Sequence, residues 1–394
     1  MCESHFKAST RSANSIESVS LFTGLAGFEL GMAPYGHNPI LFCEKEPAAQ
    51  AVLRAWKPLV RLHEDIQLLD ELPRRGKILV AGFPCTDLSA AGTRAGIFGP
   101  ASGLVRDVFR LLAKTAISTV VLENVPDLLT LGGGVGMRYI AAQFRKLGYR
   151  YAYRVVDSKY FGVPQRRRRF YIVASLRDDP REVLLTDNAE QDPPQRADTI
   201  DLDADAVGFL WTEGRLGLGL ARNSIPPLRA GYTMPAVLLP DGQLGTLSLA
   251  DAERAQALPV DWTKPGELAG ASGRWKLVGN SLTRTIPEWI ASRLEYPQPY
   301  TSGVTDRLFS PARSGWPMAA WDMGAGPRAA DVTENPCALP RPLIGPWLST
   351  ALKPLSERAS SGFLLRAGQG TLRFPPHFLE RIAAHRDRMR EIAA

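Results

Sequence analysis

The chain has 394 residues, of which 45% are hydrophobic and 22% are charged, and its formal net charge is +7. This composition is ordinary for a soluble globular protein, and the length predicts two or three compact units. The basic balance suggests a polyanionic partner. No apolar run approaches the roughly 20 residues that a membrane helix needs, which excludes a membrane-spanning protein of that kind.

The cysteines show no paired spacing, and the five histidines do not cluster with them. They stand at Cys2, Cys43, Cys85 and Cys337. We therefore expect neither a disulfide framework nor a metal site, and a reducing cytoplasm fits this usage. The polar N-terminus lacks the apolar core of a signal peptide. The expected location is the cytoplasm.

Strands alternate with helices over the first 175 residues. The predicted strands span residues 18–22, 39–43, 60–62, 78–81, 118–122, 151–156 and 170–174. The predicted helices span residues 28–32, 48–56, 106–115 and 137–147. This alternation is typical of an α/β fold with a doubly wound, mostly parallel sheet. The strand ends of such a sheet face one crevice, where ligands bind.

A glycine turn follows the first predicted strand. Gly24 and Gly27 let the backbone approach a ligand closely, with a helix N-terminus behind them. Glu44 ends the second strand about 20 residues later, a position that suits two ribose hydroxyls. Asp65 follows the third strand. It either accepts a hydrogen bond from an adenine amino group or caps the following turn.

Cys85 stands just past the end of the fourth strand, which Gly82 and Pro84 interrupt. Open α/β sheets place reactive groups at such strand ends. The stretch 89–103, rich in Gly, Ala and Ser, is long enough to form a lid over Cys85. A thiolate of lowered pKa is a nucleophile. The alternative is a buried structural cysteine.

Two further strand ends carry an acid and a cluster of arginines. Glu123 precedes Asn124 at the end of the fifth strand, and the cluster 166–169 lies between the last two strands. A carboxyl group exchanges hydrogen bonds with a ring nitrogen, and a guanidinium stabilises charge on a ring oxygen. With the thiol, these groups suit covalent attack on a polar ring beside a nucleotide-like cofactor. Alternatively, the arginines form only a solvated strand edge.

The composition changes after residue 175. Residues 176–246 are rich in Pro, Gly and Asp, which predicts a separate, irregular unit. A helix is predicted at 249–257. The stretch 275–281 is expected to lead into a second helix at 286–294, which packs back on the sheet. After a segment rich in Pro, Gly and Trp, the chain ends in an amphipathic helix at 378–392.

In this order, the motifs resemble those of the cytosine-C5 DNA methyltransferase family. The resemblance covers about residues 18–175 and 245–294. Residues 20–28 resemble the family's first S-adenosylmethionine motif, 82–85 its nucleophile motif, 123–125 its acidic motif, 165–169 its arginine motif, 249–259 its ninth motif and 279–281 its tenth motif.

The resemblance implies that S-adenosylmethionine is the cofactor and that the substrate is a cytosine flipped out of a specific duplex DNA sequence. Cys85 would add to C6 of the ring, and Glu123 would bond N3 and the amino group. Arg169 and Arg167 would contact O2 or a nearby phosphate. The cofactor pocket would be formed by Phe22, Gly24, Leu25, Gly27, Glu44, Asp65, Ile66, Pro84, Asn280 and Ser281.

The chain departs from the family's pattern at four positions. Ser20 replaces an acid, Thr86 replaces Gln, Ala250 replaces Arg and Ala255 replaces Leu. The change at Thr86 concerns a phosphate contact, and the two alanines concern the support of the recognition region. Two other functions remain open. One is the same chemistry on transfer RNA, and the other is a non-catalytic regulator that binds S-adenosylmethionine or DNA.

We expect a loose lead-in at residues 1–15, a catalytic and cofactor-binding domain at 16–175, a target-recognition region at 176–277, a returning helix at 278–297 and a C-terminal extension at 298–394. The expected partner is double-stranded DNA, bound by a monomer at the nucleoid. A restriction endonuclease for the same site would complete a restriction–modification system. The arginines of the last helix either contact DNA phosphates or are solvated on a buttress.

Overall fold

The computed structural model describes residues 15–84, 102–193, 196–211, 217–230, 234–301 and 306–393. The chain forms two compact units. The first comprises Met1–Asp157, Arg168–Gln191 and Arg284–Leu339, and the second comprises Ser158–Arg167, Asp192–Thr283 and Pro340–Ala394. Each unit therefore joins segments that are far apart in the sequence. The expected boundaries at 175, 277 and 297 do not coincide with these, because the chain crosses between the units several times.

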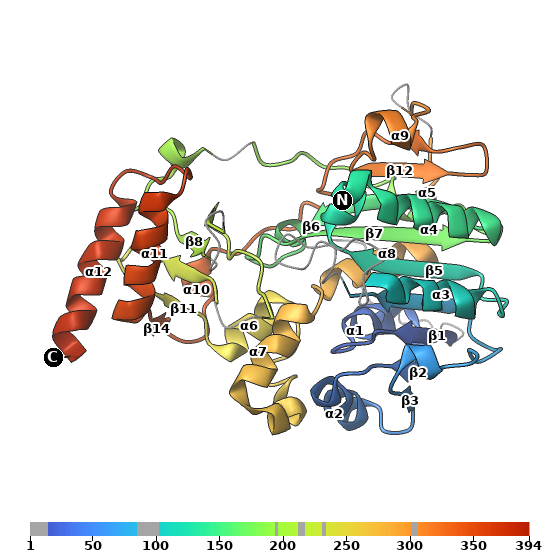
Figure 1. The fold of residues 1–394 in the computed structure, drawn as a ribbon, viewed down its shortest axis with the longest axis horizontal. Coiled ribbons are helices and arrows are strands. Elements are labelled where there is room, and N and C mark those ends of the chain that lie inside the picture. Colours follow the sequence, from blue (N-terminus) through green and yellow to red (C-terminus); the bar gives the residue numbers. More distant parts are fainter. Residues whose placement is uncertain are drawn as a thin grey trace. The chain divides into compact units, whose positions relative to one another are not determined.

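A nine-stranded sheet forms the first unit, in the order β13-β12-β6-β7-β5-β4-β1-β2-β3 (Figure 1). Its strands are β1 (Ile16–Leu21), β2 (His37–Cys43), β3 (Arg61–His63), β4 (Ile78–Gly82), β5 (Thr119–Asn124), β6 (Arg150–Asp157), β7 (Arg168–Ser175), β12 (Ala319–Asp322) and β13 (Arg328–Ala329). From β3 to β5 the neighbours are parallel. From β5 to β13 every neighbouring pair is antiparallel.

The sheet is therefore mixed, and the expectation of a mostly parallel sheet is corrected. The α/β class itself is confirmed. The physical reason lies in the connection between β6 and β7, which is only residues 158–167. A parallel pair needs a crossover of a dozen or more residues, whereas antiparallel neighbours accept a short connection. The sequence shows two apolar runs but not their relative direction.

Helices cover both faces of this sheet. They are α1 (Gly27–Met32), α2 (Pro47–Trp56), α3 (Val105–Leu112), α4 (Val135–Lys146), α5 (Arg181–Leu184), α8 (Thr285–Glu295) and α9 (Pro311–Ser314). On one face, Phe109 of α3 and Phe144 of α4 share a core with Leu122 of β5. Tyr171 alternates with core residues of β7 and so points to the other face, where its ring contacts Phe28 of α1.

Strand register brings several chain ends to one edge of the sheet. Gly82 at the end of β4 lies opposite Glu123 near the end of β5, and Leu21 at the end of β1 lies opposite Cys43 at the end of β2. Because β7 runs antiparallel to β5, its first residues reach this edge as well. The predicted cofactor turn, the acid and the last two residues of the arginine motif, Arg168 and Arg169, thus share an edge of the first unit.

The second unit contains a five-stranded antiparallel sheet in the order β14-β11-β10-β8-β9. Its strands are β8 (Val207–Leu210), β9 (Gly219–Arg222), β10 (Ala236–Leu238), β11 (Leu244–Thr246) and β14 (Lys353–Pro354). Its helices are α6 (Leu249–Ala255), α7 (Gly270–Asn280), α10 (Ile344–Trp347), α11 (Glu357–Gln369) and α12 (Phe378–Ala393). The expectation that residues 176–246 form an irregular unit is therefore wrong. The sequence did not indicate these strands because they are too short to give a clear periodic pattern. Residues 275–280, which were expected to lead into the helix at 286–294, instead belong to helix α7.

Residues 340–393 complete the core of the second unit. Phe363 of α11 and Phe378 of α12 pack with Phe209 of β8 and Leu238 of β10. Strand β14 pairs with β11 at the edge of the same sheet. The preceding part of the expected extension, which carries β12 and β13, belongs instead to the first unit. No helix in the described ranges has the length and apolar character needed to cross a membrane.

Candidate active site

The segment that leads to Cys85 is held at the end of β4. Phe83 is buried, and its carbonyl accepts a 3.0 Å hydrogen bond from the side-chain amide of Asn124. The side-chain oxygen of Asn124 accepts from the N–H of Val125 at 2.8 Å. Asn124 therefore ties the entry of this segment to the end of β5. Cys85 and Thr86 lie outside the described residues.

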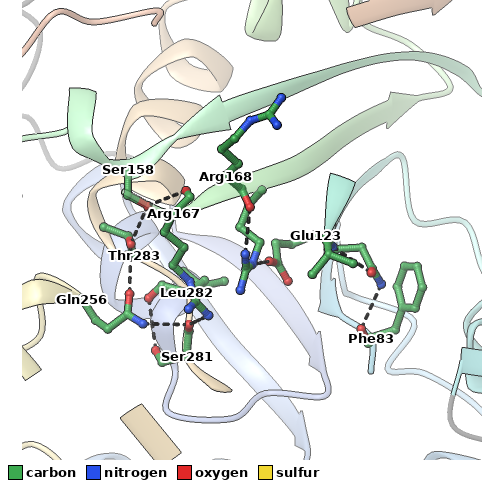
Figure 2. Close-up of polar contacts among 12 residues, drawn as sticks. Phe83, Glu123, Ser158, Arg167, Arg168, Gln256, Ser281, Leu282 and Thr283 are labelled. Atoms are coloured by element: carbon green, nitrogen blue, oxygen red, sulfur yellow. Dashed lines mark hydrogen bonds and ion pairs between the residues drawn. The ribbon is translucent and has the colours of Figure 1, made fainter. Parts of the chain in front are cut away.

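Glu123 and Arg169 form an ion pair at the same edge, with 3.1 Å between Arg169 Nε and Glu123 Oε1 (Figure 2). Both side chains are largely buried. Arg169 Nη1 also donates to the carbonyl of Arg168 at 2.8 Å. Gly82 stands next to the acid, since an added Cβ there would lie 3.2 Å from Glu123 Oε2. This pair presents a carboxyl group and a guanidinium side by side.

Arg167 belongs to the second unit and is only 2% exposed. Its Nη1 donates to the carbonyl of Leu228 at 2.8 Å, and its Nη2 donates to the carbonyl of Gly279 at 3.1 Å. Nη2 also donates to the carbonyl of Ser281 at 2.6 Å (Figure 2). These acceptors belong to the chain itself. The guanidinium of Arg167 therefore links the arginine motif to the tenth-motif segment by hydrogen bonds. Because Arg167 is buried, the alternative that it lies on a solvated strand edge is wrong for this residue.

A buried polar network surrounds the ninth-motif helix in the second unit. Gln165 Nε2 donates to the carbonyl of Ala255 at 2.7 Å and to Gln256 Oε1 at 3.2 Å. Thr283 Oγ1 donates to Gln256 Oε1 at 3.0 Å and lies 2.8 Å from Ser158 Oγ. Gln165 contacts the backbone carbonyl of Ala255. The presence of Ala where the family typically has Leu therefore leaves this hydrogen bond intact. Sequence reasoning missed Ser158 and Thr283, which carry no local signal.

The glycine turn after β1 is closed by Glu44. The N–H of Gly24 donates to Glu44 Oε2 and the N–H of Glu46 donates to Oε1, both at 2.7 Å. Burial raises the pKa of Glu44, against the opposing effect of these hydrogen bonds. Phe22, Gly24 and Ala26 have φ values of 55°, 56° and 62°. An added Cβ at Gly24 would meet nothing within 4 Å, so the turn leaves open space there.

Asp65 caps the short helix η2 (Ile66–Leu68), where its carboxylate accepts from the N–H of Gln67 at 3.0 Å. Lys45 Nζ donates to the same carboxylate at 3.0 Å. The backbone hydrogen bond and then Lys45 hold the pKa of Asp65 below its ordinary value. The capping alternative is confirmed, and contact with an adenine stays a prediction.

The other predicted cofactor residues fall into two groups. In the first unit, Leu25 is buried within the glycine turn, Gly27 begins α1 and Pro84 follows the anchored Phe83. Asn280 and Ser281 stand at the end of α7 in the second unit. The structure thus brings Gly24 and Glu44 into direct contact, and the same edge of the first unit carries the acid–arginine pair.

One edge of the α/β sheet thus carries a glycine turn with a strand-end carboxylate and, next to them, an acid–arginine pair. This arrangement defines a class of group-transfer enzymes. Residues 16–208 match the model of a family described as C-5 cytosine-specific DNA methylase. The chain is also 38% identical to type II methyltransferase M2.BsuMI of Bacillus subtilis (strain 168). That match spans 386 residues, which are 94% of this chain and 98% of that protein.

The chain therefore belongs to the C-5 cytosine-specific DNA methylase family, and its activity is cytosine-C5 methylation of DNA. Type II methyltransferase M.MspI of Moraxella sp is 29% identical over 159 residues, which are 40% of this chain and 38% of that protein. The Entamoeba histolytica methyltransferase EhMeth shares the fold, with a TM-score of 0.52 and 14% identity over 72% of this chain and 98% of that chain. The family resemblance is thereby confirmed.

Proposed function

We propose that this enzyme transfers the methyl group of S-adenosylmethionine to C5 of a cytosine flipped out of a specific duplex DNA sequence, through a covalent bond between Cys85 and C6. The observation that carries the proposal is the Glu123–Arg169 pair. It lies on the same sheet edge as the anchored segment that leads into Cys85. In a duplex the neighbouring bases cover both faces of a cytosine ring, from which C6 and C5 must be attacked, so the base must leave the stack.

The glycine turn fits a nucleotide-like cofactor. The open space at Gly24 admits close approach of a ligand, and Glu44 is a half-buried carboxylate of the kind that accepts from ribose hydroxyls. Bound S-adenosylmethionine would supply an electrophilic methyl group. The residues proposed to hold it are Phe22, Gly24, Leu25, Gly27, Glu44, Asp65, Ile66, Pro84, Asn280 and Ser281.

In the proposed reaction the Cys85 thiolate forms a bond to C6, and the electron pair of the C5–C6 double bond moves onto C5. Glu123 shares a proton with N3 and accepts from the exocyclic amino group, which stabilises the activated ring. Arg169 stabilises charge on O2. The electron pair on C5 forms the bond to the methyl group as the bond from that methyl group to sulfur breaks, and the pair of the broken bond stays on sulfur. A water molecule then accepts the C5 proton, and the electron pair of the C5–H bond re-forms the ring double bond as the Cys85–C6 bond breaks. The thiolate is thereby released.

Arg167 takes a different role in this proposal. Three backbone carbonyls of the second unit occupy its guanidinium, which argues for a positioning role and against contact with the ring. Its neighbour Gln165 is likewise engaged by buried polar groups. We therefore assign the ring contact of the arginine motif to Arg169 alone.

The second unit is proposed to read the DNA sequence. The similarity to one type II methyltransferase, M2.BsuMI, over 94% of this chain supports a modification enzyme whose partner is an endonuclease for the same site. Bisulfite sequencing of DNA from cells that express the chain gives the recognition sequence directly. Methylation confined to one short sequence is expected, whereas methylation at every cytosine would contradict a recognition role for the second unit.

The nucleophile assignment is tested with Cys85→Ala and a duplex that carries 5-fluorocytosine at the target. Fluorine does not leave as a proton does, so the wild-type enzyme with cofactor is expected to form a persistent covalent complex at Cys85. The variant should form none and should lose methyl transfer. Cys43→Ala is the matched control, because Cys43 is buried and burial raises its pKa to about 12. Transfer RNA serves as the second polymer and should not be methylated.

A further inference from the structure

Glu334 contacts β6 and β7 where the two strands begin to separate. Its backbone carbonyl accepts from the N–H of Asp157, the last residue of β6, at 3.2 Å. Its carboxylate accepts two hydrogen bonds from Arg168, the first residue of β7. One joins Nε to Oε2 at 2.8 Å, and the other joins Nη2 to Oε1. Asp157 and Arg168 form the last register pair between these strands.

The segment around Glu334 is itself fixed. The carbonyl of Thr333 accepts from Nε of the fully buried Arg154 at 2.7 Å, and the N–H of Thr333 donates to Asn188 Oδ1 at 2.7 Å. On the other side, the N–H of Ala189 donates to the carbonyl of Asn335 at 2.9 Å. Glu334 is therefore held from both neighbouring residues and can act as an anchor.

The anchored strand end carries the active-site arginine. The chain leaves the first unit after Asp157 and returns to it at Arg168. Strand pairing stops there, and the end of a strand opens more readily than its middle. The carbonyl of Arg168 accepts from Arg169 Nη1 at 2.8 Å, and Arg169 Nε pairs with Glu123. Contacts therefore run from Glu334 through Arg168 to the acid–arginine pair.

We propose that Glu334 is a positioning residue for methyl transfer, which holds the first residue of β7 and so keeps the Arg169 guanidinium against Glu123. A guanidinium paired with a carboxylate by two hydrogen bonds is fixed in orientation as well as in distance. Loss of this pair removes the carboxylate that orients Arg168. The start of β7 is then held by strand pairing and by the hydrogen bonds from Ser158 to the carbonyl of Arg167. The proposal rests on the roles given above to Glu123 and Arg169. It gives the extension before residue 340 a part in the reaction.

The test compares Glu334→Gln with Asp322→Asn in the full chain, with duplex DNA and S-adenosylmethionine. Asp322 lies in the same extension, is buried and pairs with Arg145 at 2.9 Å, away from the arginine motif. We expect kcat to fall about tenfold or more in Glu334→Gln. Loss of a hydrogen bond between charged groups changes the population of the positioned arginine by about that factor. The KM values for DNA and cofactor should stay within about twofold, and Asp322→Asn should keep the wild-type kcat in its folded fraction.

A charge exchange completes the test. Arg168→Glu alone should lower kcat as Glu334→Gln does, whereas Arg168→Glu combined with Glu334→Arg should restore most of it. A wild-type kcat in Glu334→Gln, or an equal loss of kcat in Asp322→Asn, would overturn the positioning role. An inactive wild-type chain on every duplex tested would instead contradict the proposed function.

Discussion

Arg169 Nε lies 3.1 Å from Glu123 Oε1, although the two residues stand on strands that run in opposite directions. Glu123 is next to the last residue of β5, and Arg169 is next to the first residue of β7. In a parallel arrangement the start of β7 would lie at the far edge of the sheet. The antiparallel direction of β7 is therefore what places a guanidinium beside the acid before any substrate binds.

Replacement of Glu123 by Gln is expected to keep the fold and to lower the rate of methyl transfer about a hundredfold or more. Gln matches the shape of Glu but cannot share a proton with N3 of the ring. Single-turnover methyl transfer on a duplex with one target site measures the effect. Glu17→Gln is the control, because Glu17 pairs with Arg75 at 3.2 Å in a partly exposed ion pair. An unchanged rate in Glu123→Gln would leave Glu123 with a structural role only.

Replacement of Phe363 by Ala is expected to destabilise the second unit by about 3–5 kcal/mol, the usual cost of removing a buried Phe ring. The Phe363 ring is fully buried, and its centroid lies 4.6 Å from that of Phe209. Hydrogen exchange of the β8 and β10 amides measures the loss. Leu365→Ala, on the same helix but 65% exposed, should change little. Equal hydrogen-exchange rates of these amides in Phe363→Ala and Leu365→Ala would mean that α11 does not stabilise this sheet.

Replacement of Arg386, Arg388 and Arg390 together by Ala is expected to leave DNA affinity and its salt dependence unchanged. Arg386 already pairs with Asp387 at 2.8 Å, and Arg390 pairs with Glu357 at 3.2 Å. Exposed ion pairs of this kind contribute little to stability, so the variant should fold. The slope of log affinity against log salt is the measurement. A slope that falls by about one unit per arginine would identify phosphate contacts and contradict the buttress role.

Glu29 makes the stability of the first unit depend on pH. Its side chain is fully buried in α1, and burial raises its pKa from 4.5 to about 7, against a smaller opposing effect of the Ser20 hydroxyl. The folded state thus holds a proton that the unfolded state releases near pH 4.5. This contribution is fully present below pH 4.5 and is lost as pH rises through about 7. Its full size is about 3 kcal/mol.

Glu29→Gln should remove this dependence. Between pH 4 and pH 8, the free energy of unfolding of the variant should therefore rise by about 3 kcal/mol relative to that of the wild type. Hydrogen exchange of the β1 and β4 amides at several pH values measures it, and the exposed Glu64→Gln is the control. Parallel curves for wild type and Glu29→Gln would mean that Glu29 is not protonated in the folded state near neutral pH.

The local motifs were accessible from the sequence because their chemistry depends on neighbours in the chain. A strand followed by Gly24, an acid such as Glu44 at the next strand end, and Glu123 after an apolar run are each specified within a few residues. Repeated strand–helix alternation likewise predicts an α/β sheet, since hydrophobic periodicity is a local property. The same locality explains why the short strands β8 to β11 were not predicted, because three or four residues give little periodic signal.

The sequence by itself thus determined the family, the α/β class and the candidate acid. The tertiary structure decided what each arginine of the motif does. Arg167, Arg168 and Arg169 are neighbours in the chain, yet their guanidinium groups meet backbone carbonyls of the second unit, the Glu334 carboxylate and the Glu123 carboxylate respectively. Those partners are distant in sequence. Only the direction of β7 and the packing of remote segments select them, because hydrogen bonds and ion pairs depend on distance in space.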